Sequence, residues 1–188
     1  YKRQAFSQVG TNCGLVGQNA CVEVDGSAYW MSENGFFRYA GKLESLPCLV
    51  EDFVYDDINL ESGNQMVSAG LNNLFGEVIW FYPSSTSDVV NKMVAYNYFD
   101  STLLKRPVWT VGTLSRTMWK DSSVFGKPHA LEYDAATDTS FDVVGNTEGR
   151  TSYYEHETGT DQNKNGTITA VVSNISSGDF DITQRVLR

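Results

Sequence analysis

The chain has 188 residues and carries 14 Lys and Arg against 23 Asp and Glu, which gives a formal net charge of −9. This acidic balance argues against a protein whose main task is to neutralise a nucleic-acid backbone, because that task needs dense Lys and Arg. Hydrophobic residues make up 41% of the chain, enough for a packed core and too many for intrinsic disorder. Aromatic residues reach 13%, with ten Tyr and ten Phe among them, which favours β-structure.

No run of apolar residues approaches the roughly 18 that a membrane-spanning helix needs. The longest uninterrupted run is Val78–Tyr82. The first residues, Tyr1–Gln4, carry positive charge, but no hydrophobic region follows them, so we expect no signal peptide. The chain starts without Met and its last residues, Asp181–Arg188, have the pattern of a strand. We therefore expect a processed chain or an ordered segment of a longer polypeptide.

Three cysteines, Cys13, Cys21 and Cys48, form no pair of CxxC units, and the two histidines lie far from them in the sequence. This spacing argues against a structural zinc site. An odd number of cysteines is typical of reduced, buried thiols in a protein that folds in the cytosol. We expect neither a metal nor another cofactor.

Short apolar or alternating runs between clusters of Gly, Asn, Asp and Ser recur along the chain, which is the pattern of an all-β protein. The predicted strands are Ala20–Val24, Ala28–Met31, Phe36–Tyr39, Gln65–Gly70, Val78–Tyr82, Met93–Tyr98, His129–Tyr133, Ser140–Val144, Arg150–Glu157, Thr167–Ile175 and Phe180–Val186. One segment is ambiguous, because Ser87–Tyr98 has apolar residues at helical spacing while its second half alternates equally well as a strand.

Three dipeptides predict tight hairpin turns: Asp25-Gly26, Asn34-Gly35 and Asn165-Gly166. Both central residues of a type I′ turn need a positive φ, which Asn, Asp and Gly adopt most readily.

A loose repeat of aromatic strand pairs runs through the chain, and its centres, Trp30, Trp80 and Leu131, are 50 and 51 positions apart. Periods of about 40–50 residues with a few strands each are typical of the blades of a β-propeller. An irregular β-sandwich can give the same spacing by chance. We predict an all-β fold of β-propeller-like antiparallel blades over residues 1–145. A C-terminal β-hairpin region over residues 146–188 would complete or flank the propeller.

Glu51–Asp57 is the first acidic cluster, and paired carboxylates can perform acid–base or glycosidase chemistry. Asp56 and Asp57 are neighbours in sequence, however, and would point to opposite faces of a strand. We interpret the cluster as a solvated strand end, because charged side chains mostly lie outside.

Asp161–Gly166 matches the opening of a calcium loop of the EF-hand type. The position that should supply the bidentate Glu is Val172, and the pattern predicts no flanking helices. A polar hairpin tip is the better interpretation, and calcium at this loop is the alternative.

Glu155-His156-Glu157 places a histidine between two carboxylates, but in a strand the two Glu side chains share one face and His156 takes the other. His129 follows Pro128 without an evident partner in the sequence. No serine-nucleophile, zinc-protease, phosphate-loop or dinucleotide motif is present. We expect a structural or surface role for both histidines and predict no catalytic residue.

Two aromatic clusters, Tyr96–Phe99 and Tyr153-Tyr154, are candidate platforms for a sugar or a protein partner, although such residues more often pack in a core. Lys105-Arg106 and Arg116 form at most a small basic patch.

Patterns of aromatic strands and flanking turns occur at Asn12–Val16, Ala28–Ser32, Gly35–Tyr39, Leu46–Cys48, Asp56–Asn59, Glu77–Pro83, Trp109–Gly112, Tyr154–Gly159 and Ser177–Asp181. Together these segments resemble tail-associated structural proteins of double-stranded DNA bacteriophages. The resemblance is to β-propeller-like proteins of the packaged-DNA stabilisation or tail-nozzle kind in short-tailed phages. Full members of that family are much longer than this chain.

The resemblance implies a structural virion protein, made in the host cytoplasm, that sits at the head–tail junction or in the tail. It implies several copies in a ring around the DNA channel, with portal, adaptor and tail proteins as neighbours. Packaged DNA would pass nearby without sequence-specific binding, since an acidic wall repels phosphate. Tyr and Trp on strand faces suit subunit contacts.

Two other interpretations stay open. The first is a receptor- or glycan-binding tail domain, which exposed aromatic side chains would favour. The second, ranked last, is a polysaccharide-degrading enzyme that uses Asp52, Asp56 or Glu155 and needs two carboxylates spaced across a cleft.

Overall fold

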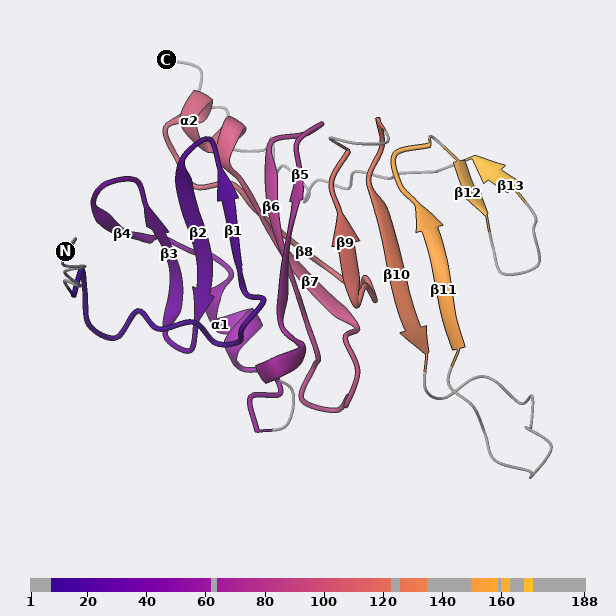
Figure 1. Cartoon of the computed structure of the whole chain (residues 1–188), viewed down its shortest axis with the longest axis horizontal. Coiled ribbons are helices and arrows are strands. Elements are labelled where there is room, and N and C mark those ends of the chain that lie inside the picture. Colours follow the sequence, from indigo (N-terminus) through magenta and orange to yellow (C-terminus); the bar gives the residue numbers. More distant parts are fainter. Residues whose placement is uncertain are drawn as a thin grey trace, which may run out of the picture. The chain divides into compact units, whose positions relative to one another are not determined.

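In a computed structural model, the protein is described over residues 8–61, 64–122, 126–134, 150–158, 160–162 and 168–170. The described residues form mostly antiparallel β-sheets, which confirms the all-β prediction (Figure 1). The chain divides into two compact units, Tyr1–His156 and Glu157–Arg188.

The described residues of unit 1 form three antiparallel sheets in which strands adjacent in the sequence pair with one another. The first sheet is built from β1 (Cys21–Val24), β2 (Ser27–Ser32), β3 (Gly35–Tyr39) and β4 (Leu43–Leu46). The second is built from β5 (Ser68–Asn72), β6 (Glu77–Tyr82), β7 (Lys92–Asn97) and β8 (Trp109–Gly112). The third is built from β9 (Met118–Lys120), β10 (His129–Asp134) and β11 (Arg150–Glu155).

In the described part of the chain, three short helices interrupt the sheets: α1 (Glu51–Tyr55), the 3-10 helix η1 (Asn64–Met66) and α2 (Tyr98–Leu104). In unit 2, β12 (Thr160–Gln162) pairs with β13 (Ile168–Ala170).

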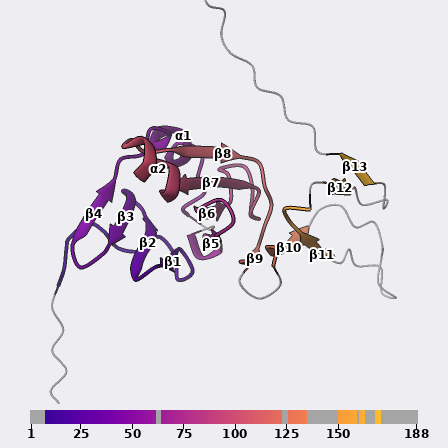
Figure 2. The ribbon, with the colours of Figure 1, turned by 90° about the horizontal axis from the view of Figure 1, so that it is seen from above.

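The three sheets follow the repeat that the sequence predicts. Trp30, Trp80 and Leu131 lie on β2, β6 and β10, and each of these is the second strand of its sheet. The first strands of the sheets are neighbours in space, because β1 contacts β5 and β5 contacts β9 (Figure 2). Among the described strands, no sheet closes into a barrel or a propeller.

Tryptophan side chains join neighbouring sheets through hydrogen bonds to backbone carbonyls. Trp80 Nε1 in the second sheet donates to the Ala20 oxygen before β1 at 3.1 Å, and Trp109 Nε1 donates to the Pro47 oxygen after β4 at 2.9 Å. Trp119 Nε1 in the third sheet donates to the Leu71 oxygen in β5 at 2.8 Å. A buried indole N–H needs such an acceptor, which applies to Trp80, and all three bonds link one sheet to the next.

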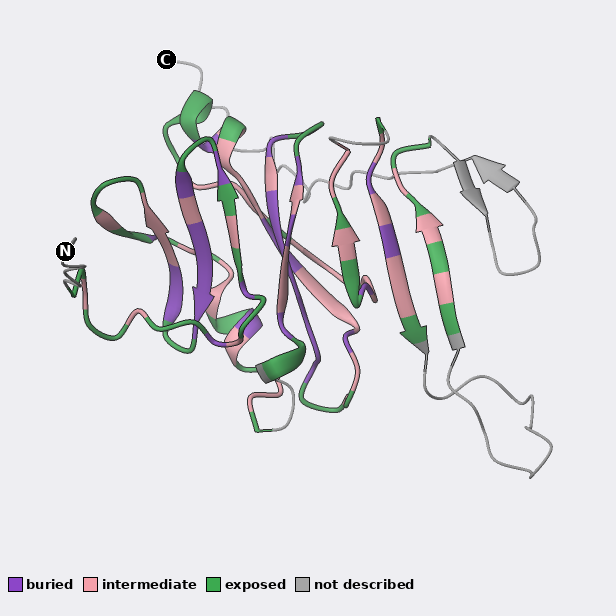
Figure 3. Ribbon diagram, in the orientation of Figure 1, coloured by how far each residue is buried: buried purple, intermediate pink, exposed green. Residues whose placement is uncertain are grey.

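Strand β6 lies at the centre of the core and is buried on both faces (Figure 3). Val78, Trp80 and Tyr82 pack into the larger apolar cluster, whereas Ile79 and Phe81 pack into a second one. Because side chains alternate across a strand, burial of both faces requires an unbroken apolar run. This requirement explains the longest apolar run of the sequence.

Local structure differs from the prediction in the acidic segment, because Glu51–Tyr55 forms helix α1 and not the end of a strand. Glu51 and Asp52 occupy the first helical turn, where the helix dipole favours negative charge, and Val54 of the same helix is fully buried.

In the ambiguous segment Ser87–Tyr98, the strand interpretation is confirmed and the helical one is wrong. Lys92–Asn97 forms β7, where Val94 and Ala95 are buried.

Several strand limits also differ. β5 begins at Ser68, not at Gln65, because η1 occupies Asn64–Met66, and β11 ends at Glu155. Of the predicted strand over residues 167–175, the structure describes Ile168–Ala170, as β13. The predicted strands Ser140–Val144 and Phe180–Val186 lie outside the described residues. Strands β4, β8, β9 and β12 were not predicted.

The turn at Asp25-Gly26 is confirmed, with φ of +49° and +76° at its two central residues. The second hairpin turns one residue earlier than predicted: Ser32 pairs with Gly35, so Glu33 and Asn34 form its centre. Gly35 closes that turn with φ of +129°. Asn165-Gly166 lies outside the described residues.

The three cysteines are free thiols, but the prediction that they are buried is wrong. Cys21 is exposed on β1, and Cys13 and Cys48 are half-buried.

Candidate functional site

Helix α2 stands between β7 and β8 at one end of the second sheet, and polar side chains define both of its ends. Asn97 caps its start, since Oδ1 accepts a hydrogen bond from the Asp100 backbone N–H at 2.7 Å. Ser101 Oγ accepts a hydrogen bond from the Val108 backbone N–H at 2.9 Å, which returns the chain toward β8. Lys105 ends the helix in the left-handed region, with φ of +52°.

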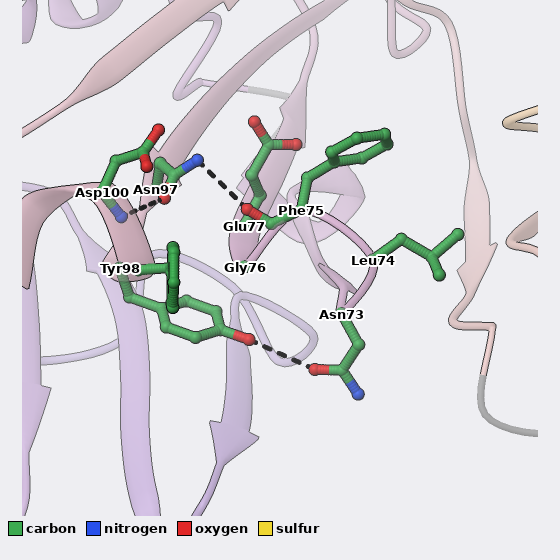
Figure 4. A pocket seen from close by; sticks show the side chains of 9 residues that line it. Asn73, Leu74, Phe75, Gly76, Glu77, Asn97, Tyr98 and Asp100 are labelled. Atoms are coloured by element: carbon green, nitrogen blue, oxygen red, sulfur yellow. Dashed lines mark hydrogen bonds between the residues drawn. The ribbon is translucent and has the colours of Figure 1, made fainter. Parts of the chain in front are cut away.

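The turn between β5 and β6 packs closely against the start of α2. Gly76 has φ of +67°, and a Cβ there would lie 2.6 Å from Cβ of Phe99, so the approach requires glycine. The Gly76 oxygen accepts a hydrogen bond from the Tyr98 backbone N–H at 2.9 Å. Asn97 Nδ2 donates to the Phe75 oxygen at 3.1 Å, so Asn97 bridges the turn and the helix (Figure 4).

Turn and helix together present large apolar side chains to solvent. We call this surface the α2 face and define it by Leu74, Phe75, Phe99, Leu103 and Leu104, which are between 51% and 69% exposed. Phe99 and Leu103 are four residues apart and therefore share one side of the helix. Single exposed apolar residues are ordinary, but a group of five on adjoining elements marks a candidate interaction surface.

A pocket of about 550 Å³ opens beside the α2 face (Figure 4). Leu74, Phe75 and Phe99 contribute apolar walls, and Glu77 and Asp100 contribute carboxylates. No basic residue is among the described residues that line it. Beyond the last turn of α2, the exposed pair Lys105 and Arg106 carries the opposite charge.

A second, smaller pocket of about 230 Å³ lies between the first and second sheets. Its lining includes Tyr29, Tyr96 and Tyr98, whose rings pack with centroids 6.2 Å (Tyr29–Tyr96) and 6.3 Å (Tyr29–Tyr98) apart. The Arg38 guanidinium carbon lies 5.6 Å from the centroid of the Tyr29 ring. The structure thus divides the candidate platform Tyr96–Phe99: Tyr96 and Tyr98 line this pocket, Tyr98 also lines the first pocket, and Phe99 belongs to the α2 face.

Arg116, two residues before β9, is buried, so the prediction that it joins Lys105 and Arg106 in a basic patch is wrong. Its Nε donates to His156 Nε2 at 2.9 Å, and its guanidinium pairs with Glu132 at 3.3 Å. The guanidinium carbon lies 3.9 Å from the centroid of the Tyr154 ring. These contacts give the buried cation both an ion pair and a hydrogen bond.

The pKa of His156 falls to about 4, because burial disfavours the charged imidazolium and the nearby positive charge of Arg116 adds to this effect. His156 is therefore neutral at pH 7 and can accept the hydrogen bond from Arg116. The other histidine, His129, stacks on Tyr153 with ring centroids 5.5 Å apart, and the Tyr153 hydroxyl contacts its Nδ1. The Tyr153-Tyr154 cluster is thus divided between this pair and the Arg116 contact.

The carboxylates considered for an enzyme lie on different elements. Asp52 is in α1 and Asp56 directly follows it, whereas Glu155 is in β11 of the third sheet and pairs with Lys127 at 3.6 Å. Asp57 Oδ2 lies 3.6 Å from Lys92 Nζ, so this carboxylate is engaged in an ion pair.

Among the described residues, no group of three or more His, Cys, Asp or Glu side chains is placed to hold a metal ion. Of the segment Asp161–Gly166, interpreted as a polar hairpin tip with calcium as the alternative, Asp161 and Gln162 lie in β12, and the residues after them lie outside the described ones.

The α2 face was missed by sequence reasoning, apart from Phe99. The signal that could have indicated it is the helical spacing of Phe99 and Leu103, followed by Leu104 and a basic pair.

The sequence matches no protein-family model, and no curated protein is significantly similar to it. In the described part of the chain, no helix has both the length and the apolar character needed to cross a membrane.

Proposed function

We propose that this chain is a structural protein of a phage particle, placed at the head–tail junction or in the tail. In this proposal it has no enzymatic activity, and several copies form a ring around the DNA channel. Its neighbours are the portal or adaptor and other tail proteins.

The observation that carries the proposal is the succession of three up-and-down sheets whose first strands are neighbours, β1 beside β5 and β5 beside β9. Blades of a β-propeller are arranged in this way around their axis, each a small antiparallel sheet that buries its faces against the next. The fold we propose is accordingly propeller-like. It agrees with the resemblance of the aromatic strand segments to nozzle-type phage proteins.

Charge supports the same proposal. A net charge of −9 leaves few cations to bind phosphates, so DNA can move past the protein without adhering to it.

Immunogold electron microscopy of phage particles from the source culture, with an antibody raised against this chain, tests the assignment. We expect label at the head–tail junction. Label on distal fibres would favour receptor recognition instead, and particles without label would contradict a virion protein.

The pocket between the first two sheets favours a second candidate, a receptor- or glycan-binding tail domain. Tyr96 and Tyr98, which are half-buried, offer aromatic faces to the apolar side of a sugar ring, and Arg38 offers hydrogen-bond donors for its hydroxyls. Binding on a glycan array that is lost in Arg38→Ala but kept in Lys42→Ala, a change at an exposed residue of the β3–β4 turn, would support this candidate. An array without signal would exclude the glycan form of it.

A further inference from the structure

We propose that two copies of this chain pair through the α2 face about a two-fold axis, with helix α2 of one copy antiparallel to α2 of the other. The pairing goes beyond the proposed function, because it concerns the free chain and does not depend on a place in a phage particle. A ring around a channel uses head-to-tail contacts, so this two-fold contact belongs to a different assembly.

The first argument is that the α2 face exposes large apolar side chains to solvent. Phe99 and Leu103 are the two most exposed members of the α2 face, at 64% and 69%, and they lie on the same side of the helix. Leu74 and Phe75 continue this surface onto the β5–β6 turn, which Asn97 ties to the helix. The Asn97 cap at the start of the helix, and the hydrogen bond from the Val108 N–H to Ser101 in its middle, tie the helix to the flanking chain and hold these side chains in place before any partner binds.

The second argument is charge, and it identifies the occupant as a second copy. Glu77 and Asp100 lie by the start of α2, and Lys105 and Arg106 follow its end. Seven helical residues span about 10 Å, so both charges are close to the apolar side chains. When the second helix runs antiparallel, its basic end lies beside the acidic end of the first, and the reverse holds at the other side.

Such self-complementarity is the condition for a two-fold contact, in which one patch meets the same patch of the partner. A second copy supplies the charge opposite to each end of the face, so the surface matches itself. The pocket of about 550 Å³ adds a receptacle for an apolar side chain, and Leu103 of the second copy has the chemistry to enter it.

Sedimentation velocity of the full chain over a wide range of concentrations tests the pairing. We expect a monomer–dimer equilibrium, and Phe99→Ser and Leu103→Ser should each raise the dissociation constant by roughly tenfold or more. Leu49→Ser is the matched control, because Leu49 is 82% exposed outside the α2 face and its loss should leave the constant unchanged. Circular dichroism of each variant checks that the fold persists.

Charge reversal tests the two-fold geometry. Asp100→Arg alone and Arg106→Asp alone should each weaken self-association, because like charges then meet on both sides of the contact. An equal mixture of these two variants should form a heterodimer, since each reversed charge meets its opposite. Lys42→Asp, a reversal at an exposed residue outside the face, is the control.

Three results would overturn the proposal. One is a chain that stays monomeric at every concentration, in which case something other than a second copy covers the face. Another is a dimer that is insensitive to the changes at Phe99 and Leu103. The last is a pair of weakened charge variants whose mixture does not associate. None of these results bears on the immunogold experiment, so the two proposals fail separately.

Discussion

Gly70 in β5 allows the second and third sheets to pack closely, because it has no side chain at the point where they meet. A Cβ at this position would lie 2.6 Å from Cδ1 of Trp119 in β9. The indole of Trp119 has little room to move, because its Nε1 donates to the Leu71 oxygen and its ring packs on Phe81 with centroids 5.6 Å apart. A methyl group at position 70 must therefore displace the third sheet or break that hydrogen bond.

We predict that Gly70→Ala lowers the free energy of unfolding by about 1–3 kcal/mol, the usual effect of overpacking. Urea denaturation followed by tryptophan fluorescence measures it. Gly14→Ala is the matched control, because a Cβ at Gly14 meets nothing within 4 Å. Equal stability of the two variants would show that β9 does not pack on β5 as described.

His156 makes stability depend on pH through its contact with Arg116. Its pKa is about 4 in the folded chain and about 6.5 when unfolded, so between these values the unfolded state binds more protons. Folding is therefore most favoured above pH 6.5. The stabilisation is lost as the pH falls toward 4, because protonation charges a buried imidazole and, in addition, places a second positive charge beside Arg116.

We predict that this histidine contributes up to roughly 3 kcal/mol to the loss of stability between pH 7 and pH 4. Unfolding free energies of the wild type and of His156→Gln, measured across this range, isolate the contribution because every other titrating group is shared. The glutamine keeps an acceptor for Arg116 and cannot be protonated. Parallel pH profiles for the two proteins would contradict the assignment.

At the scale of elements, β6 connects the first two sheets through Trp80. The indole is fully buried, packs on Phe36 with ring centroids 4.9 Å apart, and donates to the Ala20 oxygen 60 positions away in sequence. Trp30 is the corresponding residue of the first sheet, but its Nε1 donates to the Cys13 oxygen, in the segment before β1.

We predict that Trp80→Phe lowers the free energy of unfolding by about 2–4 kcal/mol, because it removes a buried hydrogen bond between sheets and leaves a small cavity. Trp30→Phe makes the same chemical change away from the contact between the sheets, so it should lower the free energy of unfolding by less. Thermal or urea unfolding measures both. An equal loss of stability in the two variants would show that the Trp80–Ala20 hydrogen bond between the sheets adds nothing to stability.

The sequence predicted the inner strands better than the outer ones, for a physical reason. Strands β2, β6, β7 and β10 were predicted because burial on one or both faces leaves alternating or continuous apolar residues. Strand β4, with the sequence Leu-Glu-Ser-Leu, is four residues long and half exposed, so its pattern is too weak to recognise. Helix α2 was missed because its apolar residues face solvent and give no core-facing stripe.

For the whole molecule, the period of about 50 residues is the feature that the sequence and the structure share. Trp30, Trp80 and Leu131 occupy equivalent second strands, so the repeat in the sequence corresponds to a repeat of sheets. The order of those sheets in space could not be predicted, because β1, β5 and β9 are far apart in the chain. Their contact depends on how the faces of whole sheets fit together.

By itself, the sequence determined the all-β class, the main strands, the Asp25-Gly26 turn and the spacing of the sheets. All of these follow from periodicity and turn chemistry, which act over a few residues. Only the tertiary structure decided that Arg116 is buried against His156, 40 positions away, and that the apolar residues of α2 lie outside. The physical reason is that burial of a side chain depends on which distant segment packs over it, and local patterns do not contain that information.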